Sequence, residues 1–219
     1  MQKKAYERFY NRYGKRLFDI IISGIGLCVL FPLFLIISVA IVIEDGFPIF
    51  YRADRGGYKG KTFRICKFRS MIKNADKIGG GTTALNDSRI TKVGNFLRKT
   101  KLDEIPQLAQ CFIGSMSLIG CRPELLRYVE QYEGDEKDIL QVRPGITDYS
   151  SVEFINLDEI VGSENADEMY EKYVLKEKNR LRIKYAYTVS LKTDIYILFK
   201  TLGAVIHKAF GFIVKKEHR

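Results

Sequence analysis

The sequence predicts a mainly helical α+β protein attached to a membrane through its N-terminal part. Three observations lead to this prediction. Residues 20–43 form an uncharged apolar run, residues 49–68 contain two β-rich segments around a glycine-rich turn, and the C-terminal half has helical periodicity. We therefore expect residues 1–45 to form a juxtamembrane and membrane segment, and residues 46–219 to form a cytosolic, membrane-associated domain.

The apolar run is long enough to cross a bilayer. At about 1.5 Å per residue its 24 residues make roughly 36 Å of helix, against a hydrocarbon core of about 30 Å. Pro32 lies near its centre, where its ring collides with the carbonyl of Cys28, so we expect the helix to kink or break. Basic residues flank the run on both sides and prefer the cytoplasmic face. This favours a re-entrant helix, while a single kinked span remains an open alternative.

The remaining elements follow from local patterns. Ile49–Arg52 and Thr62–Phe68 are rich in β-formers and enclose a glycine-containing turn, which predicts a β-hairpin. Residues 165–190 have helical periodicity, and residues 192–215 form an amphipathic helix pattern, basic on one half and apolar on the other, that is typical of a membrane interface. Four shorter elements are expected between these segments: helices at 93–100, at 103–112 and from Pro123, and a strand at 115–119.

Charge is unevenly distributed along the chain, whose formal net charge is +10. Basic blocks at residues 52–101 and 172–219 flank an acidic block at residues 133–171. A basic excess suits anionic lipids, phosphorylated small molecules or nucleic acids, and charge alone does not choose among them. The four cysteines include no CxxC pair, so we expect reduced thiols rather than a disulfide framework or a zinc site.

The stretch RKTKLDEIPQL at residues 98–108 contains the adjacent carboxylates Asp103 and Glu104. Acidic residues are common at helix starts because the helix dipole favours them, so the pair alone is ordinary. Several cations surround it in the sequence, and such a group can hold a phosphate beside an acid. Mg²⁺ can bridge carboxylate and phosphate, and an aspartate in this setting can attack phosphorus. The cations in question are Arg98, Lys99, Lys101, Arg122 and Arg127.

Several motifs resemble those of the bacterial sugar transferases that act as monotopic phosphoglycosyl transferases. They occur in order over nearly the whole chain, and the block from residue 87 to residue 125 is the most specific. The motifs are KRLFD at 15–19, KFRSM at 67–71, DSRITKVGNFLRKTKLDEIPQL at 87–108, SMSLIGCRPEL at 115–125 and RPGIT at 143–147.

The resemblance implies a reaction. Such enzymes move a sugar 1-phosphate from a UDP-sugar to undecaprenyl phosphate and release UMP, as the first membrane step in the synthesis of capsule, O-antigen, exopolysaccharide or glycoprotein glycans. Residues 46–219 then form the catalytic domain, at the cytoplasmic face of the bacterial inner membrane. The resemblance implies no nucleic-acid partner and leaves a homodimer open. It also favours the re-entrant form of the helix, broken at Pro32.

The same resemblance assigns roles to residues. Asp103 is expected to be the nucleophile that takes up the phosphosugar, with Glu104 assisting through the metal or by proton transfer. Both carboxylates are expected to bind Mg²⁺. Arg98, Arg122 and, more weakly, Lys67 are expected to bind substrate phosphate, as guanidinium groups suit phosphate oxygens.

The chain also departs from the pattern of many relatives. Phe31 precedes Pro32 where they carry serine, so a carbonyl freed at the break needs another partner, such as Ser23 or water. Cys121 replaces a proline before Arg122, which relaxes the backbone there. A non-catalytic, basic, membrane-bound module for anions is the alternative function, but a pure anion binder gains nothing from a carboxylate pair among its cations.

Overall fold

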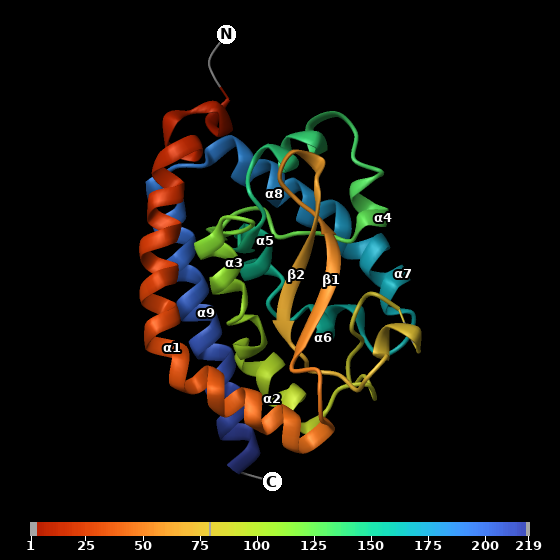
Figure 1. The fold of residues 1–219 in the computed structure, drawn as a ribbon. Coiled ribbons are helices and arrows are strands. Elements are labelled where there is room, and N and C mark those ends of the chain that lie inside the picture. The colour runs from red at the N-terminus through yellow and green to blue at the C-terminus, as the bar shows by residue number, and fades with distance from the viewer. Residues whose placement is uncertain (1–3, 79, 218–219) are drawn as a thin grey trace.

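The computed structural model describes residues 4–78 and 80–217, and it is mainly helical (Figure 1). The two longest helices, α1 and α9, lie along one side, and the short helices and the β-hairpin lie on the other. In chain order the elements are η1 (Ala5–Glu7), η2 (Tyr10–Gly14), α1 (Lys15–Asp45), β1 (Phe50–Gly56), η3 (Tyr58–Gly60), β2 (Thr62–Phe68), η4 (Ala75–Lys77), α2 (Lys92–Thr100), η5 (Leu102–Glu104), α3 (Gln107–Ile113), β3 (Ser117–Ile119), α4 (Leu126–Val129), η6 (Gly134–Gln141), β4 (Gly145–Thr147), α5 (Tyr149–Glu153), α6 (Leu157–Val161), α7 (Ala166–Tyr170), η7 (Glu171–Leu175), α8 (Lys176–Thr188) and α9 (Leu191–Glu217).

Helix α1 runs through Pro32 without interruption, so the expected break is not seen, although the ribbon changes direction along its length (Figure 1). Proline inside a helix bends it because one backbone hydrogen bond is missing. Ser23 donates to the carbonyl of Asp19 at 2.5 Å, one turn before its own position, and therefore does not serve the carbonyl that faces Pro32. Ser38 likewise donates to the carbonyl of Phe34 at 2.7 Å.

The polar and apolar faces of α1 are inverted relative to a helix of a water-soluble protein. Lys15, Asp19 and Ser23 recur every four residues and are fully buried against the rest of the protein. Large apolar side chains on the opposite side are exposed, Ile25 by 58% and Val29 by 70%. An extended apolar surface of this kind indicates contact with lipid or with another apolar partner.

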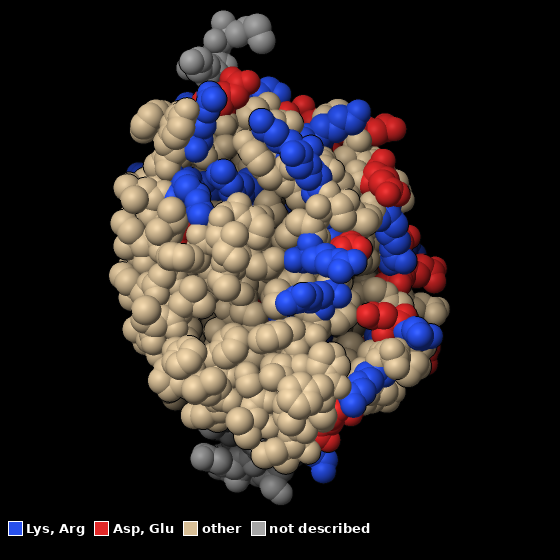
Figure 2. Space-filling model, in the orientation of Figure 1, with Lys and Arg blue, Asp and Glu red and all other residues tan. Residues whose placement is uncertain are grey.

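Helix α9 has the same inverted arrangement. Its buried positions include Asp194, whereas Phe199, Ile206 and Phe210 are exposed. By length and composition, the segments Tyr10–Asp45 and Leu191–Phe212 could each cross a membrane. Figure 2 shows that the left and lower parts of the visible face, over α1, carry few charged groups, while Lys and Arg gather toward the top and right. The amphipathic pattern predicted near the C-terminus is confirmed as α9.

The predicted hairpin is confirmed: β1 and β2 pair antiparallel, with Phe50 opposite Phe68 and Gly56 opposite Thr62. The predicted strand at 115–119 is confirmed in a shorter form, β3, and it pairs in parallel with β4, which the sequence patterns did not predict. The backbones of β3 and β4 approach closely, because a Cβ on Gly145 would lie 2.1 Å from the amide nitrogen of Gly120.

Two helix predictions need correction. The helix expected over residues 103–112 is divided into η5 and α3: the N–H of Ile105 bonds three residues back to the carbonyl of Leu102, and Pro106, which follows, has no N–H to donate. Lys101, in a left-handed conformation (φ 61°), ends α2 before this turn. The helix expected from Pro123 begins only at Leu126. The pattern over 165–190 is confirmed as the consecutive helices α7, η7 and α8.

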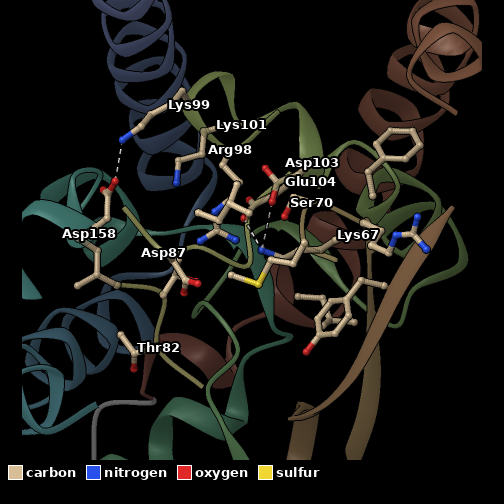
Figure 3. Close-up of a pocket in the computed structure, with 18 of the residues that line it drawn as sticks. Lys67, Ser70, Thr82, Asp87, Arg98, Lys99, Lys101, Asp103, Glu104 and Asp158 are labelled. Carbon is tan, nitrogen blue, oxygen red and sulfur yellow. Dashed lines mark hydrogen bonds and ion pairs between the residues drawn. The ribbon is translucent and has the colours of Figure 1, made fainter. Parts of the chain in front are cut away.

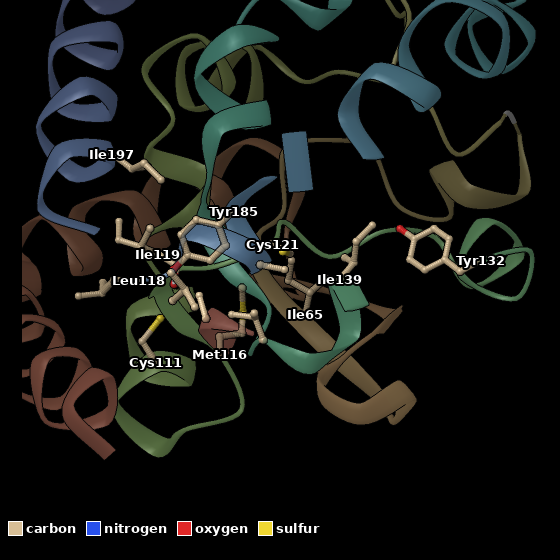
Figure 4. Packing of buried hydrophobic residues seen from close by; sticks show 14 residues of the cluster. Ile65, Cys111, Met116, Leu118, Ile119, Cys121, Tyr132, Ile139, Tyr185 and Ile197 are labelled. Carbon is tan, nitrogen blue, oxygen red and sulfur yellow. The ribbon is translucent and has the colours of Figure 1, made fainter. Parts of the chain in front are cut away.

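Three groups of buried apolar residues hold these elements together. The largest contains Ile65, Cys111, Met116, Ile119 and Tyr185, which gather between the hairpin, β3 and α8 (Figure 4). All four cysteines are free thiols, as expected. A second group joins α1 to α2 and to the residue that follows η5, and it therefore connects the apolar helix to the segment carrying the carboxylate pair.

Candidate active site

A cavity of about 1160 Å³ lies beside the hairpin and is lined by β1, β2, α2, η5, α5 and one side of α9 (Figure 3). The five polar residues that the sequence singled out all line it, although they come from four separate segments. Lys67 is on β2, Arg98 on α2, Asp103 and Glu104 on η5, and Arg122 on the loop after β3. The fold therefore brings the predicted site residues together.

Local structure aims the carboxylates into the cavity. The left-handed Lys101 ends α2 directly before η5, so the chain turns sharply at the cavity wall. Ile105, the next residue after η5, is buried in the apolar group shared with α1. This anchor leaves Asp103 and Glu104, which are 5% and 9% exposed, on the polar side of the turn.

Glu104 is held by two cations. Lys67 donates from Nζ to Glu104 Oε1 at 2.7 Å, and Arg122 donates from Nη1 to Oε2 at 3.1 Å and from Nη2 to Oε1. Burial opposes ionisation of this carboxyl, but Arg122 and Lys67 outweigh burial and hold the pKa of Glu104 well below its ordinary value. Arg122 is fixed in turn by the carbonyl of Ile146 and, through its backbone N–H, by Asp148.

Asp103 is less occupied than its neighbour. Its Oδ2 lies 4.0 Å from Lys67 Nζ, and its Oδ1 is buried without a hydrogen-bond partner among the described residues. Burial and the adjacent charge of Glu104 raise the pKa of Asp103, while Lys67 and Lys101 act in the opposite direction. A carboxylate with one unengaged oxygen in a cavity is suited to nucleophilic attack or to metal binding.

Of the cations that act on Asp103, Arg98 and Lys101 have no ion-pair partner within the described part of the chain. Both are labelled in Figure 3 on the same side as Asp103 and Glu104. Burial lowers the pKa of Lys101 to about 8, because an ammonium is poorly solvated there. Lys99, next to them in sequence, is instead paired with Asp158 at 2.8 Å.

Mg²⁺ fits this site through Asp103. No group of three metal-ligating side chains occurs among the described residues, but Mg²⁺ in phosphate sites needs only one or two carboxylates with substrate oxygens. The unpartnered Oδ1 of Asp103 is one such ligand. Both oxygens of Glu104 already accept hydrogen bonds from Lys67 and Arg122, so a metal would have to share or displace these contacts.

Some residues around the cavity were missed by the sequence analysis. Lys101 was noted among the cations but not assigned to the site, although its place directly before the LDE turn was a signal. Lys178 and Arg182 line the cavity from α8, where their spacing of four residues puts them on one helix face. In a helix rich in charge, that spacing alone does not distinguish them from solvent-facing residues.

Comparisons with known proteins agree with the motif pattern. The profile of the family described as bacterial sugar transferase matches residues 10–208. The chain is 35% identical over 213 residues to the UDP-glucose:undecaprenyl-phosphate glucose-1-phosphate transferase of Klebsiella pneumoniae, a match that covers 95% of this chain and 42% of that protein. It is 35% identical over 207 residues to the exopolysaccharide production protein ExoY of Sinorhizobium fredii (strain NBRC 101917 / NGR234), covering 88% of this chain and 85% of that protein.

A third relative is the UDP-N-acetylgalactosamine-undecaprenyl-phosphate N-acetylgalactosaminephosphotransferase of Aeromonas hydrophila, which is 33% identical over 199 residues. That match covers 88% of this chain and 43% of the relative, so the chain spans less than half the length of some relatives and most of the length of ExoY. The carboxylate pair and the cavity both lie within the matched residues. The chain belongs to the bacterial sugar transferase family.

Proposed function

We propose that the protein transfers a sugar 1-phosphate from a UDP-sugar to undecaprenyl phosphate and releases UMP, at the cytoplasmic face of the bacterial inner membrane. The observation that carries this proposal is the unpartnered Oδ1 of Asp103, buried beside the unpaired cations Arg98 and Lys101. The names of the relatives in Klebsiella and Aeromonas support the same class of substrates. The step begins the assembly of a surface polysaccharide, in line with the name of ExoY.

The reaction has two displacements at phosphorus. An oxygen of Asp103 attacks the phosphorus that carries the sugar, the bond from that phosphorus to the bridging oxygen breaks, and UMP leaves with the oxygen. A phosphate oxygen of undecaprenyl phosphate then attacks the phosphorus of the aspartyl phosphosugar. The aspartyl–phosphorus bond breaks, the carboxylate of Asp103 is restored, and an undecaprenyl diphosphate sugar is formed.

The cations divide into two pairs with different roles. Lys67 and Arg122 are engaged by Glu104, which stays ionised because of them, so Glu104 acts by positioning these two groups rather than by donating a proton. Among the described residues Arg98 and Lys101 have no such partner, which leaves them available to bind substrate phosphate. Fixed cations stabilise the charge that spreads over a transferring phosphoryl group without reorganisation during the step.

Mg²⁺ is proposed as the cofactor, with Asp103 Oδ1 as its protein ligand. When bound, it neutralises charge on the diphosphate and polarises its oxygens. Removal of Mg²⁺ with a chelator is expected to stop UMP release, and added Mg²⁺ should restore it. Activity that persists in excess chelator would remove the metal from the proposal.

The membrane arrangement is proposed to be re-entrant. Glu44, near the end of α1, accepts hydrogen bonds from the backbone N–H groups of Lys92 and Val93 at 2.7 and 2.9 Å. The end of α1 is therefore tied to the start of α2, on the same body as the cavity. Single cysteines placed before residue 15 and after residue 46 test the topology, after Cys28, Cys66, Cys111 and Cys121 have been replaced. Labelling from opposite faces of the membrane would establish a bitopic span instead.

The activity is tested with purified protein in lipid nanodiscs, undecaprenyl phosphate, Mg²⁺ and a panel of UDP-sugars, with UMP release as the readout. Asp103→Asn should lower turnover on the order of 10³-fold or more, because the nucleophile is lost. Asp54→Asn, at an exposed position on β1, is the matched control and should leave turnover unchanged. With labelled donor and no acceptor, the parent should retain a phosphosugar on Asp103. Normal turnover of the Asn variant would refute the nucleophile assignment.

A non-catalytic anion-binding module is the competing function. Its binding of polyanions should weaken steeply with salt, and Asp103→Asn should strengthen it by removing a negative charge. No UMP should then form from any UDP-sugar. The two functions are thus separated by the sign of the effect of the same substitution.

A further inference from the structure

The cavity continues beyond the carboxylate pair to a buried group of polar side chains, here called the deep cluster: Glu124, Tyr170, Lys178 and Arg182. All four line the cavity and are at most 9% exposed. They come from the loop after β3, the end of α7 and one face of α8. The proposed reaction gives none of them a role.

The carboxylate of the deep cluster is fully used within the protein. Glu124 Oε2 accepts hydrogen bonds from Arg182 Nη2 at 2.9 Å and from the hydroxyl of Tyr170, and Oε1 accepts from the N–H of Leu125 at 3.0 Å. Burial opposes its ionisation, but Arg182 and Lys178 lower the pKa of Glu124 to about 2. Its single negative charge therefore offsets only one of the two cations beside it.

Two hydrogen-bond donors are left over. Lys178 Nζ contacts the neutral hydroxyl of Tyr170 at 3.3 Å, and no carboxylate pairs with it within the described residues. Arg182 Nε is buried without a hydrogen-bond partner. A buried cation without a counter-charge is costly, and buried donors normally have partners. Lys178 therefore brings a positive charge without a paired carboxylate to the cavity wall, and the buried guanidinium of Arg182 behind it keeps one unused donor.

We propose that the deep cluster is the sugar subsite for the UDP-sugar and that it selects a hexuronate, whose carboxylate is bound by Lys178 and Arg182. This inference rests on the proposed function, because it takes the reacting phosphorus to lie at Asp103. Lys178 and Arg182 contact Tyr170 and Glu124, and within the described residues neither forms an ion pair with Asp103 or Glu104. We therefore take the deep cluster to meet a part of the donor other than its reacting phosphate.

Charge distinguishes a uronate from the neutral groups of the donor that could lie there. A uracil carbonyl or a sugar hydroxyl offers a hydrogen-bond acceptor but leaves the positive charge uncompensated. A carboxylate supplies both an acceptor for Lys178 and the missing negative charge, and charge-assisted hydrogen bonds are the stronger kind. Burial lowers the pKa of Lys178 to about 7, so the free site can lose its proton near neutrality and regain it with an anionic ligand.

The test compares UDP-glucuronate and UDP-galacturonate with UDP-glucose and UDP-galactose in the UMP-release assay. The parent should use at least one uronate with a kcat/KM about tenfold or more above that of the matching neutral sugar. Lys178→Met should raise KM for that uronate about tenfold or more, with kcat and the neutral sugars changed less than about threefold. Lys176→Met, at an exposed position on the same helix, is the matched control and should change neither.

A pH profile of the parent protein tests the same claim without a substitution. KM for the uronate should rise between about pH 6 and pH 8.5, as free Lys178 loses its proton, while KM for the neutral sugar should follow only the groups common to both. The groups whose charge or ionisation bears on this profile are Tyr170, Glu124, Arg122 and Asp148 from neighbouring elements, and Arg182 from α8 itself.

Three results would overturn the proposal. One is a preference for neutral sugars with no sugar-dependent effect of Lys178→Met. Another is that Lys178→Met weakens inhibition by UDP or UMP as much as it weakens use of the uronate, which would assign the subsite to the uridine. The third applies if no UDP-sugar yields UMP, in which case the proposed function fails and the subsite is tested by binding alone. The subsite proposal is then overturned if UDP-glucuronate stabilises the protein thermally no more than UDP-glucose does, or if its stabilisation survives Lys178→Met.

Discussion

The pairing of Arg122 with Glu104 makes a quantitative prediction about how the two residues act. Arg122 donates twice to this buried carboxylate, once at 3.1 Å from Nη1 and once from Nη2. A hydrogen bond to a charged group contributes about 1.5–3 kcal/mol, and contacting residues in one network couple by about 0.5–3 kcal/mol. We expect a coupling near the upper end of that range, about 2–3 kcal/mol, since both bonds are buried.

In the UMP-release assay, Arg122→Ala should therefore lower kcat/KM roughly 30- to 1000-fold, which corresponds to a loss of about 2–4 kcal/mol of transition-state stabilisation. Glu104→Gln should cost a similar amount because it releases the same guanidinium and also Lys67. The double variant should lose little more than the worse single variant, because both changes disrupt one unit. Arg64→Ala, which alters an exposed pair on the hairpin, should leave kcat/KM within about twofold.

Additive losses in the double variant would refute this reasoning. They would mean that Arg122 acts on substrate phosphate independently of Glu104. The division of kinetic effects gives a second check: a positioning role predicts that Arg122→Lys restores part of kcat, since an ammonium can still reach Glu104. The unfolding temperature of each variant, measured in the same lipid, separates these effects from general loss of structure.

Three further predictions follow from buried charge and close packing. Lys101→Met should raise KM for the UDP-sugar about tenfold at pH 7, and an unchanged KM would contradict this. In the parent, KM should rise above about pH 8 because Lys101 loses its charge, and this rise should be smaller in the variant. Lys15→Met leaves Asp194 buried without its cation and should lower the free energy of unfolding by about 3–5 kcal/mol. The double variant with Asp194→Leu should recover most of this loss. Calorimetry in detergent measures both variants, and a loss under about 1 kcal/mol for Lys15→Met would be inconsistent with the reasoning. Gly94→Ala should destabilise by about 1–3 kcal/mol, since its Cβ would lie 2.0 Å from a carbonyl oxygen, while Gly203→Ala meets no atom within 4 Å and should not destabilise.

Much of the fold could be predicted because its signals are local. The uncharged run at 20–43, the β-rich segments around the turn at 56–60 and the amphipathic pattern at 192–215 each determine an element over consecutive residues. The parallel pairing of β3 with β4 could not be predicted, because it joins two three-residue strands that lie far apart in the chain. The sequence predicted β3, but β4 is too short for its periodicity to identify it, and neither strand carries a local signal of its partner.

The division of the segment 103–112 has a similar cause. Propensity favours a helix over these residues, and proline in a first turn is compatible with one. The structure instead forms a separate tight turn, η5, buries Ile105 against α1 and starts α3 only after Pro106. Tertiary packing thus overrides the local preference. The left-handed Lys101 before this turn is not signalled either, because the sequence has no glycine or asparagine there.

For the site, the sequence could identify the participants better than their pairing. The carboxylate pair and Arg98 are close in sequence, so their proximity follows directly. Lys67 and Arg122 reach Glu104 from segments 37 and 18 residues away, and that geometry depends on the whole fold. Which cations are neutralised and which are free is therefore visible only in three dimensions, and the assignment of roles depends on it.

The apolar helix α1 contributes directly to the construction of the site. Ile37 and Ile41 of α1 pack in one group with Leu97 of α2 and with Ile105, which directly follows Glu104. Figure 1 shows the second part of α1 running beneath α2, where Glu44 caps the N-terminus of α2. A straight α1 would carry this part away from α2, which would expose the apolar group and leave the N-terminus of α2 uncapped. The bend in α1 and the position of the carboxylates are thus coupled, so that a change at Pro32 should alter turnover even though it is remote from the carboxylate pair.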